Sequence, residues 1–87
     1  MAMAVPNRLV EIAAEMEQLQ NEIQERRRVL NFLLRSVRTR DPAEREERIN
    51  AARENLKERE RRLQVLQTEQ QELIVQVAIT ASHPQRD

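Results

Sequence analysis

The ionisable side chains of this chain are numerous, but their types and spacing do not form a catalytic site. The only histidine, His83, stands beside Pro84 in a predicted tail, where it lacks fixed neighbours for general-base or metal chemistry. A carboxylate metal site of the four-helix kind normally adds a glutamate-x-x-histidine motif, and the sequence has none. Cysteine and glycine are absent, which removes thiolate chemistry and the usual phosphate-binding loops. We therefore expect a non-enzymatic protein with no catalytic residues, no metal site and no cofactor.

Three consecutive arginines, Arg26, Arg27 and Arg28, form the one candidate basic patch. Arginine clusters bind phosphate groups, so this run suggests a nucleic-acid contact. No aromatic residue is interleaved with it for base stacking, and glutamates of a second helix are expected alongside. The 15 basic residues of the chain are balanced by 15 acidic ones, so net charge gives no general attraction to nucleic acid. Nucleic-acid binding is therefore the third functional hypothesis, after two forms of protein binding.

The elements that position these side chains are two long helices. Charged residues form 34% of the chain and aromatic residues 1%, which is typical of coiled coils. Apolar residues recur at alternating steps of three and four, as they do along the seam between coiled helices. The first series lies in a predicted helix over 7–38 and consists of Leu9, Ile12, Met16, Leu19, Ile23, Leu30, Leu33 and Val37. The second lies in a predicted helix over 42–81 and consists mainly of Ile49, Leu56, Leu63, Leu66, Leu73 and Val77.

The two series are out of phase, so one continuous helix would place many glutamates in the core. The break falls at Asp41 and Pro42, which favour a helix start with Asp41 as its cap. The connection, predicted at 39–41, is short, and short connections join antiparallel neighbours. The sequence therefore predicts one all-α domain, a two-helix antiparallel coiled-coil hairpin with tails at 1–6 and 82–87.

The register of the hairpin also follows from the numbering. Facing seam positions have residue numbers that sum to 82, as for Leu19 and Leu63, so the symmetry centre is Asp41 itself. Charges at the positions that flank the seam, placed by the same register, give one favourable pair and two like-charge pairs. The pairs are Glu22 with Arg62, Arg27 with Arg53, and Glu15 with Glu69. The like-charge pairs suggest that a third helix supplies partners.

Two arginines, Arg26 and Arg59, interrupt the seam at mid-length. One interpretation is that their stems cross the core while their guanidinium groups reach flanking glutamates such as Glu22. The other interpretation is a recognition site for an acidic partner. The first interpretation is favoured. The two arginines could also specify one alignment of the helices over another, as buried polar residues do in other coiled coils.

Several apolar residues lie off the seam and are candidate protein contacts. The end of the second helix is apolar on nearly every side, and more than one partner helix is needed to cover such a surface. The predicted contacts at the open end of the hairpin are Val10, Ala14, Ile74, Val75, Ala78 and Ile79. Near the turn, Val29 and Phe32 are a second candidate, although Phe32 packing against its own partner helix is equally compatible with the pattern.

The predicted partners are therefore proteins. Self-association as a homodimer, through a four-helix bundle, and membership of a larger complex are both compatible with an apolar open end, so we expect a scaffold or assembly subunit. The alternative is a small helical chaperone or adaptor that covers a client helix. No apolar run is long enough for a membrane span, and no secretory signal is recognisable, so a cytoplasmic location is expected.

Overall fold

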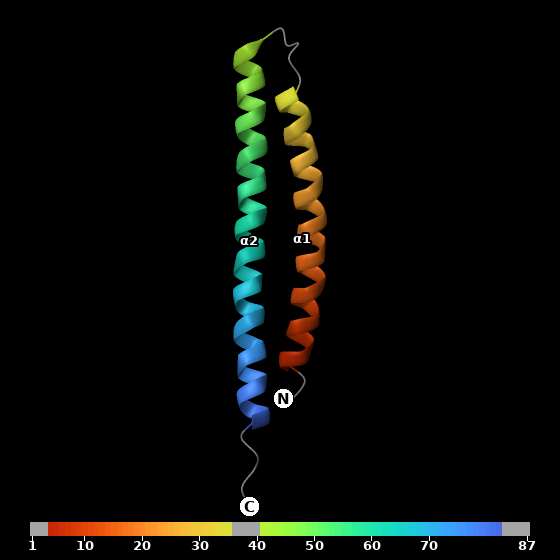
Figure 1. The fold of residues 1–87 in the computed structure, drawn as a ribbon, viewed down its shortest axis with the longest axis vertical. Coiled ribbons are helices and arrows are strands. Elements are labelled where there is room, and N and C mark those ends of the chain that lie inside the picture. Colours follow the sequence, from red (N-terminus) through yellow and green to blue (C-terminus); the bar gives the residue numbers. More distant parts are fainter. Residues whose placement is uncertain (1–3, 36–40, 83–87) are drawn as a thin grey trace, which may run out of the picture.

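The chain folds as a helical hairpin in a computed structural model that describes residues 4–35 and 41–82. Helix α1 spans Ala4–Arg35 and helix α2 spans Pro42–Ser82. The two helices lie side by side and run in opposite directions, so that the N-terminal end of α1 lies near the C-terminal end of α2 (Figure 1). The predicted all-α hairpin is thus confirmed.

The helix ends differ slightly from those expected. Helix α1 begins at Ala4 rather than at residue 7, so Pro6 lies within the first turn, where a missing backbone N–H leaves no intrahelical hydrogen bond unmade. Helix α2 begins at the expected Pro42 and extends one residue further than predicted. The predicted end of the first helix at 38, most of the turn and Val37 lie outside the described residues.

Asp41 caps the start of α2, as the sequence predicts. Its side-chain Oδ1 accepts hydrogen bonds from the backbone N–H groups of Ala43 (3.0 Å) and Glu44 (3.3 Å). Its carbonyl oxygen accepts the first intrahelical bond, from the N–H of Arg45 at 3.1 Å. The carboxylate therefore satisfies donors that would otherwise lack a partner and also places a negative charge at the positive end of the helix dipole.

The Arg45 side chain, in the first turn of α2, forms hydrogen bonds to the last turn of α1. Its Nη2 donates to the carbonyl oxygens of Leu33 (3.2 Å) and Leu34 (3.1 Å). The carbonyls of a last helical turn have no backbone partner within the helix, so a cation at this point both satisfies them and complements the helix dipole. The numbering places Arg45 in the seam, and the sequence alone gave no sign of this capping role.

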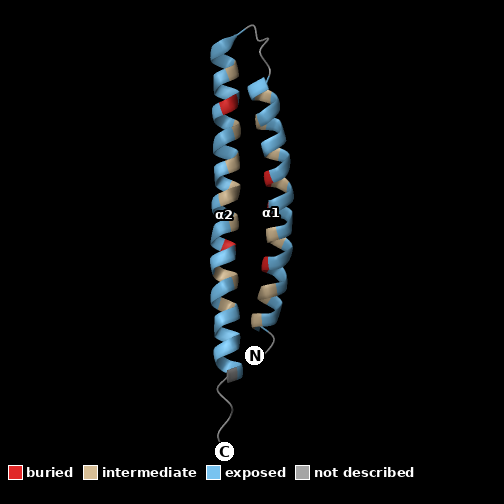
Figure 2. Cartoon of the chain, in the orientation of Figure 1, coloured by how far each residue is buried: buried red, intermediate tan, exposed pale blue. Residues whose placement is uncertain are grey.

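The core is a narrow seam between the helices, visible as the buried and half-buried positions on their facing sides (Figure 2). The buried side chains are Ile12, Leu19, Ile23, Ile49 and Leu66. The half-buried members of the predicted seam are Leu9, Met16, Leu30, Leu33, Leu56, Leu63 and Leu73. Ile12, Leu19 and Leu66 contact one another at the centre of the best-packed section. Apolar burial in this seam is the main force that holds the helices together.

Val77 departs from the prediction that it belongs to the core, because 45% of its side chain is exposed. The register places Val77 opposite Val5, next to the first residue of α1. Beyond that level, α2 continues without a described partner helix beside it. One neighbour alone cannot cover a valine, so Val77 belongs to the open end rather than to the seam.

Over residues 4–35 and 41–82, neither helix contains a stretch that is long and apolar enough to cross a bilayer.

Candidate protein-binding surfaces

One long side of the hairpin is held by ion pairs between the helices. Arg8 contacts Glu69 through two hydrogen bonds, Nε to Oε2 at 2.6 Å and Nη2 to Oε1 at 2.8 Å. Two helical turns further along α1, Glu15 accepts a hydrogen bond from Arg62 Nε at 2.9 Å. The forked contact between Arg8 and Glu69 also fixes the angle of both side chains, because the two donors and two acceptors lie in parallel.

Arg59 extends the same side toward the turn. Its Nε donates to Glu22 Oε1 at 2.8 Å, and its Nη1 donates to the backbone and side-chain oxygens of Asn55. Arg26, the other seam arginine, is half-buried one turn from Glu22. The structure thus places Arg59 as the first of the two interpretations describes, with its stem in the seam and its guanidinium on a flanking glutamate.

These contacts change the proton affinity of the carboxylates. The hydrogen bond from Arg59 lowers the pKa of Glu22, and the hydrogen bond from Arg8 lowers the pKa of Glu69. The same contact with Glu69 raises the pKa of Arg8. Each pair is therefore more firmly ionised in the folded chain than its members would be alone.

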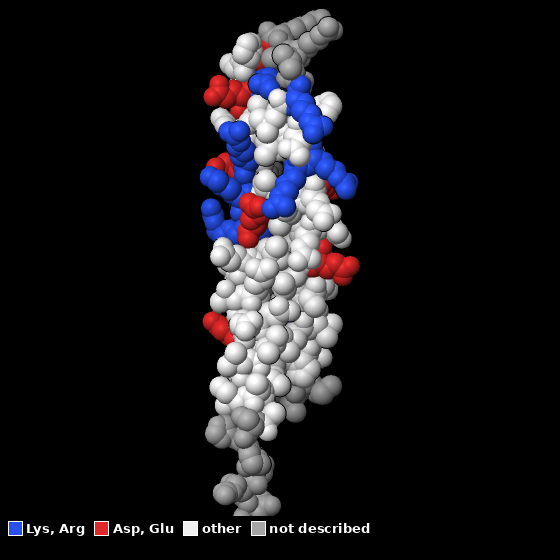
Figure 3. Space-filling view, in the orientation of Figure 1, with Lys and Arg blue, Asp and Glu red and all other residues white. Residues whose placement is uncertain are grey.

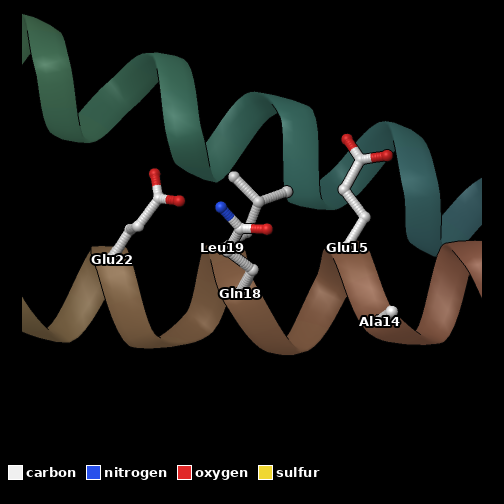
Figure 4. A pocket seen from close by; sticks show the side chains of 5 residues that line it. All are labelled: Ala14, Glu15, Gln18, Leu19 and Glu22. Carbon is white, nitrogen blue, oxygen red and sulfur yellow. The ribbon is translucent and has the colours of Figure 1, made fainter.

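We call this side the ion-pair face. Residues at alternating steps of three and four lie on one side of a helix, and the ion-pair face consists of one such row on each helix. Its members are Arg8, Glu11, Glu15, Gln18, Glu22 and Glu25 of α1 and Arg62, Val65, Glu69, Glu72, Gln76 and Ile79 of α2. Glu15 and Glu22 extend from α1 toward α2 on either side of Leu19 (Figure 4). Eight of these twelve side chains are charged.

The opposite side is nearly without charge, and we call it the neutral face. Its stripes have the same spacing and cover the same length of the helices. Its members are Pro6, Val10, Ala13, Glu17, Gln20 and Gln24 of α1 and Gln64, Gln67, Gln71, Ile74, Ala78 and Ala81 of α2. All twelve side chains are exposed, and only Glu17 is charged. The hairpin therefore has two faces of different chemistry, one on each side of the seam.

The two stripes of the neutral face adjoin one another. At their turn-proximal end, Arg27 Nη2 donates to Glu60 Oε2 at 3.0 Å and bridges the helices. Gln20 and Gln24 line a shallow groove together with these two residues. Figure 3 shows one long face of the hairpin, on which charged residues gather toward the turn and are sparse over the other half.

The open end carries five of the nine exposed large apolar residues in the described part of the chain. No charged residue lies between Leu73 and Ala81, and Val10 is 70% exposed on α1. We define the open end by its exposed apolar members: Val10, Ala13 and Ala14 of α1 and Ile74, Val75, Val77, Ala78 and Ile79 of α2. A groove at its tip is lined by Val5, Pro6, Gln76, Val77, Thr80 and Ala81. The contact residues predicted for this end are all exposed, but they lie on different sides of it: Ile74 and Ala78 are on the neutral face and Ile79 is on the ion-pair face.

Phe32 and Val29 do not join that surface. They lie about four turns away on α1, near the turn, and Phe32 is 71% exposed. Phe32 therefore does not pack against α2, which was one of its two predicted environments. Leu34 is also exposed at this end of the hairpin.

The three consecutive arginines have three different surroundings. Arg26 is half-buried in the seam, Arg27 is paired with Glu60, and Arg28 is exposed. Helical geometry turns successive residues by about 100°, so three neighbours in the sequence point in three directions. They do not form one continuous basic surface.

The flanking charge pairs predicted from the numbering are wrong. Glu15 contacts Arg62 instead of Glu69, and Arg27 contacts Glu60 instead of Arg53. Glu22, expected opposite Arg62, contacts Arg59. Each flanking residue has two neighbours across the hairpin, and long side chains reach either one, so the opposite charge is selected. The inferred need for a third helix to neutralise like charges is removed.

Within the described ranges, no three histidine, aspartate or glutamate side chains converge as a group that could hold a metal ion. Neither a family model, nor a curated protein, nor a solved structure matches this chain at a significant level.

Proposed function

We propose that this chain is a non-enzymatic interaction module, a scaffold or assembly subunit, that binds a helical protein surface through its open end. The observation that supports this most directly is the exposure of Val10, Ile74, Val75, Val77 and Ile79 at one end of the hairpin, where each residue is 45% to 70% exposed. Contiguous apolar surface of this kind costs free energy in water, and in soluble proteins it commonly marks a contact site.

The chemistry of the open end suits a helix as the partner. Its side chains are mostly valine, isoleucine and alanine, without the charges that would select an extended or acidic peptide. Ridges of such side chains at steps of three and four accept the matching ridges of another helix. A partner that supplies one or two amphipathic helices would complete a bundle around this end of the hairpin.

The test is affinity capture from the native cell with three baits: the natural chain, Ile74→Glu and Val65→Glu. Ile74 and Val65 are both exposed β-branched residues of α2, but only Ile74 belongs to the open end. We expect stoichiometric partners, copies of the chain included, to be lost with Ile74→Glu and retained with Val65→Glu. Equal capture by both variants, or no partner with any bait, would contradict the proposal.

A second function, a small chaperone or adaptor, is supported by the groove at the tip of the open end. Val5, Pro6 and Val77 line it, and an apolar segment of a client protein would fit against them. A chaperone releases its client, whereas a scaffold retains its partner. Exchange of a bound, labelled partner within minutes would favour the chaperone, and a complex that persists for hours would favour the scaffold.

A further inference from the structure

The neutral face contains a feature that the open end alone does not explain. Five of its twelve residues are glutamines, and these continue the uncharged surface from Ile74 as far as the bridge between Arg27 and Glu60. Covering a glutamine costs little free energy when its amide finds hydrogen-bond partners, whereas covering an ion pair removes two charges from water. Covering the neutral face over its whole length therefore costs less free energy than covering the ion-pair face.

We propose that the neutral face binds a second copy of this chain, side by side and pointing in the same direction, with a two-fold axis along the length of the hairpin. This inference rests on the proposed function and names its partner. Rotation about the long axis places α1 of one copy against α2 of the other. Every neighbouring pair of helices is then antiparallel, which is the arrangement of an up-down-up-down four-helix bundle.

The distribution of residues along the neutral face supports this axis. Rotation about the long axis keeps each residue at its own height, so that the apolar open ends meet one another and glutamines meet glutamines. Val10 and Ile74 then lie against the same residues of the second copy. An axis perpendicular to the hairpin would instead pack the apolar end of each copy on the glutamines of the other.

Charge complementarity supports the same arrangement. Arg27 of each copy lies level with Glu60 of the other, and the four side chains alternate in sign around the bundle. The one remaining charge, Glu17, faces the level of Gln64 and Gln67 on the second copy and meets no like charge. The pairing is thus self-complementary, as a two-fold interface requires.

The size of the face is sufficient for a stable dimer. From Pro6 to Arg27 the helix rises about 32 Å, and two helices side by side are about 20 Å wide. The footprint is then about 600 Å² on each copy, or about 1,200 Å² in total, at the lower end of specific interfaces. We therefore expect a dissociation constant in the micromolar range, about 1 to 100 μM.

The first experiment is sedimentation velocity on the full chain from low to high micromolar concentration. We expect a mass of twice 10.3 kDa at the upper concentrations. Arg27→Glu should weaken the dimer at least tenfold, since it makes all four charges of the ring acidic. Arg62→Glu breaks a matched bridge on the ion-pair face and should leave the dissociation constant within about threefold of the natural value. The double variant Arg27→Glu/Glu60→Arg should restore the dimer.

The second experiment tests the direction of the two copies. Because the chain lacks cysteine, Gln20→Cys and Gln64→Cys each introduce a single thiol. Mixed in equal amounts and treated with a short bis-maleimide, they should form a heterodimer, because Gln20 and Gln64 of opposite copies lie within about 3 Å of one height. Gln18→Cys lies at the height of Gln64 but on the ion-pair face, and it should form none with Gln64→Cys. Cross-linking of Gln18→Cys in place of Gln20→Cys would overturn the inference.

Failure of this inference and failure of the proposed function give different results. A chain that stays monomeric at all concentrations, yet captures a foreign protein through Ile74, overturns the dimer and leaves the interaction module in place. A monomer that captures nothing overturns both. A dimer that is lost with Arg62→Glu and unaffected by Arg27→Glu overturns the neutral face as its interface.

Discussion

The ion-pair face and the neutral face cover equal lengths of the same two helices, yet they differ in the surface that they leave for a partner protein to contact. Arg8, Glu15 and Glu22 find their counter-charges within the chain. The uncharged residues of the neutral face have no charge to pair, and all of them are exposed. Packing in the seam holds the two helices together. The difference between the ion-pair face and the neutral face determines which surface is left for contact.

The two faces contribute differently to the stability of the fold and to the choice of the surface that a partner binds. Exposed ion pairs contribute at most about 1 kcal/mol each, whereas burial of one leucine side chain contributes about 2 kcal/mol or more. The ion-pair face therefore adds less to folding than the seam does, but it makes that side costly to cover. Its main consequence is to direct a partner toward the neutral face.

The largest effect on stability is expected for a buried residue of the seam, because the packing of the seam supports both faces. Leu66 is 0% exposed and contacts Ile12 and Leu19. We expect Leu66→Ala to lower the free energy of unfolding by about 2–5 kcal/mol, because it removes apolar burial and leaves a cavity. The measurement is urea unfolding followed by helical circular dichroism, at one fixed protein concentration. The neighbouring Val65→Ala, at a 51% exposed site, is the control and should change stability by about 0.5 kcal/mol or less. Similar losses for both variants would show that the seam does not lie where the structure places it.

The seam was predictable because its signal is repeated. Residues such as Ile12, Leu19 and Leu66 recur at steps that only a helix brings to one side, and a single Asp41 marks the reversal. Each added turn of helix supplied independent evidence for the same register. The exposed contacts at the open end followed from the same pattern, as apolar residues in excess of what one partner helix covers.

The partners of individual charges were not predictable in the same way. Glu15 has both Glu69 and Arg62 within reach, and the spacing of the seam cannot choose between them. The choice depends on side-chain length and on charge, which act only after the backbones are paired. The division into an ion-pair face and a neutral face was therefore missed, although the two stripes can be traced in the sequence once the true partners are known.

A gain of association is the next largest expected effect. Gln67 lies at the centre of the neutral face, so Gln67→Leu adds apolar surface where the second copy is proposed to pack. We expect the dimer to tighten on the order of tenfold, equivalent to about 1.4 kcal/mol. The matched variant Gln18→Leu, on the ion-pair face, should leave the dissociation constant nearly unchanged. Sedimentation equilibrium measures both, and equal tightening would remove the distinction between the faces.

The bridges of the two faces should also differ in their effect on folding. The Arg59 side chain is 23% exposed, with its stem in the seam, whereas the Arg27 side chain is 59% exposed. We expect Arg59→Ala to lower the free energy of unfolding by about 1 kcal/mol, chiefly through lost packing of the stem. Arg27→Ala should cost only a few tenths of a kcal/mol. Both are measured by urea unfolding at a low micromolar concentration that favours the monomer, and a larger loss for Arg27→Ala would reverse the comparison.

The smallest effect expected is a dependence of stability on pH that originates on the ion-pair face alone. The contacts with Arg59 and Arg8 lower the folded-state pKa of Glu22 and Glu69. The ionised carboxylates therefore stabilise the fold fully above the unfolded-state value of about 4.3, and the stabilisation is lost as the pH falls through the lower folded-state pKa. The melting temperature should decline between about pH 5 and pH 2, and Glu22→Gln/Glu69→Gln should decline less. The control, Glu17→Gln/Glu72→Gln, changes two exposed glutamates that make no ion pair in the described part of the chain, and it should follow the natural chain. If the control flattened the profile instead, the acid sensitivity would come from overall charge rather than from the bridges between the helices.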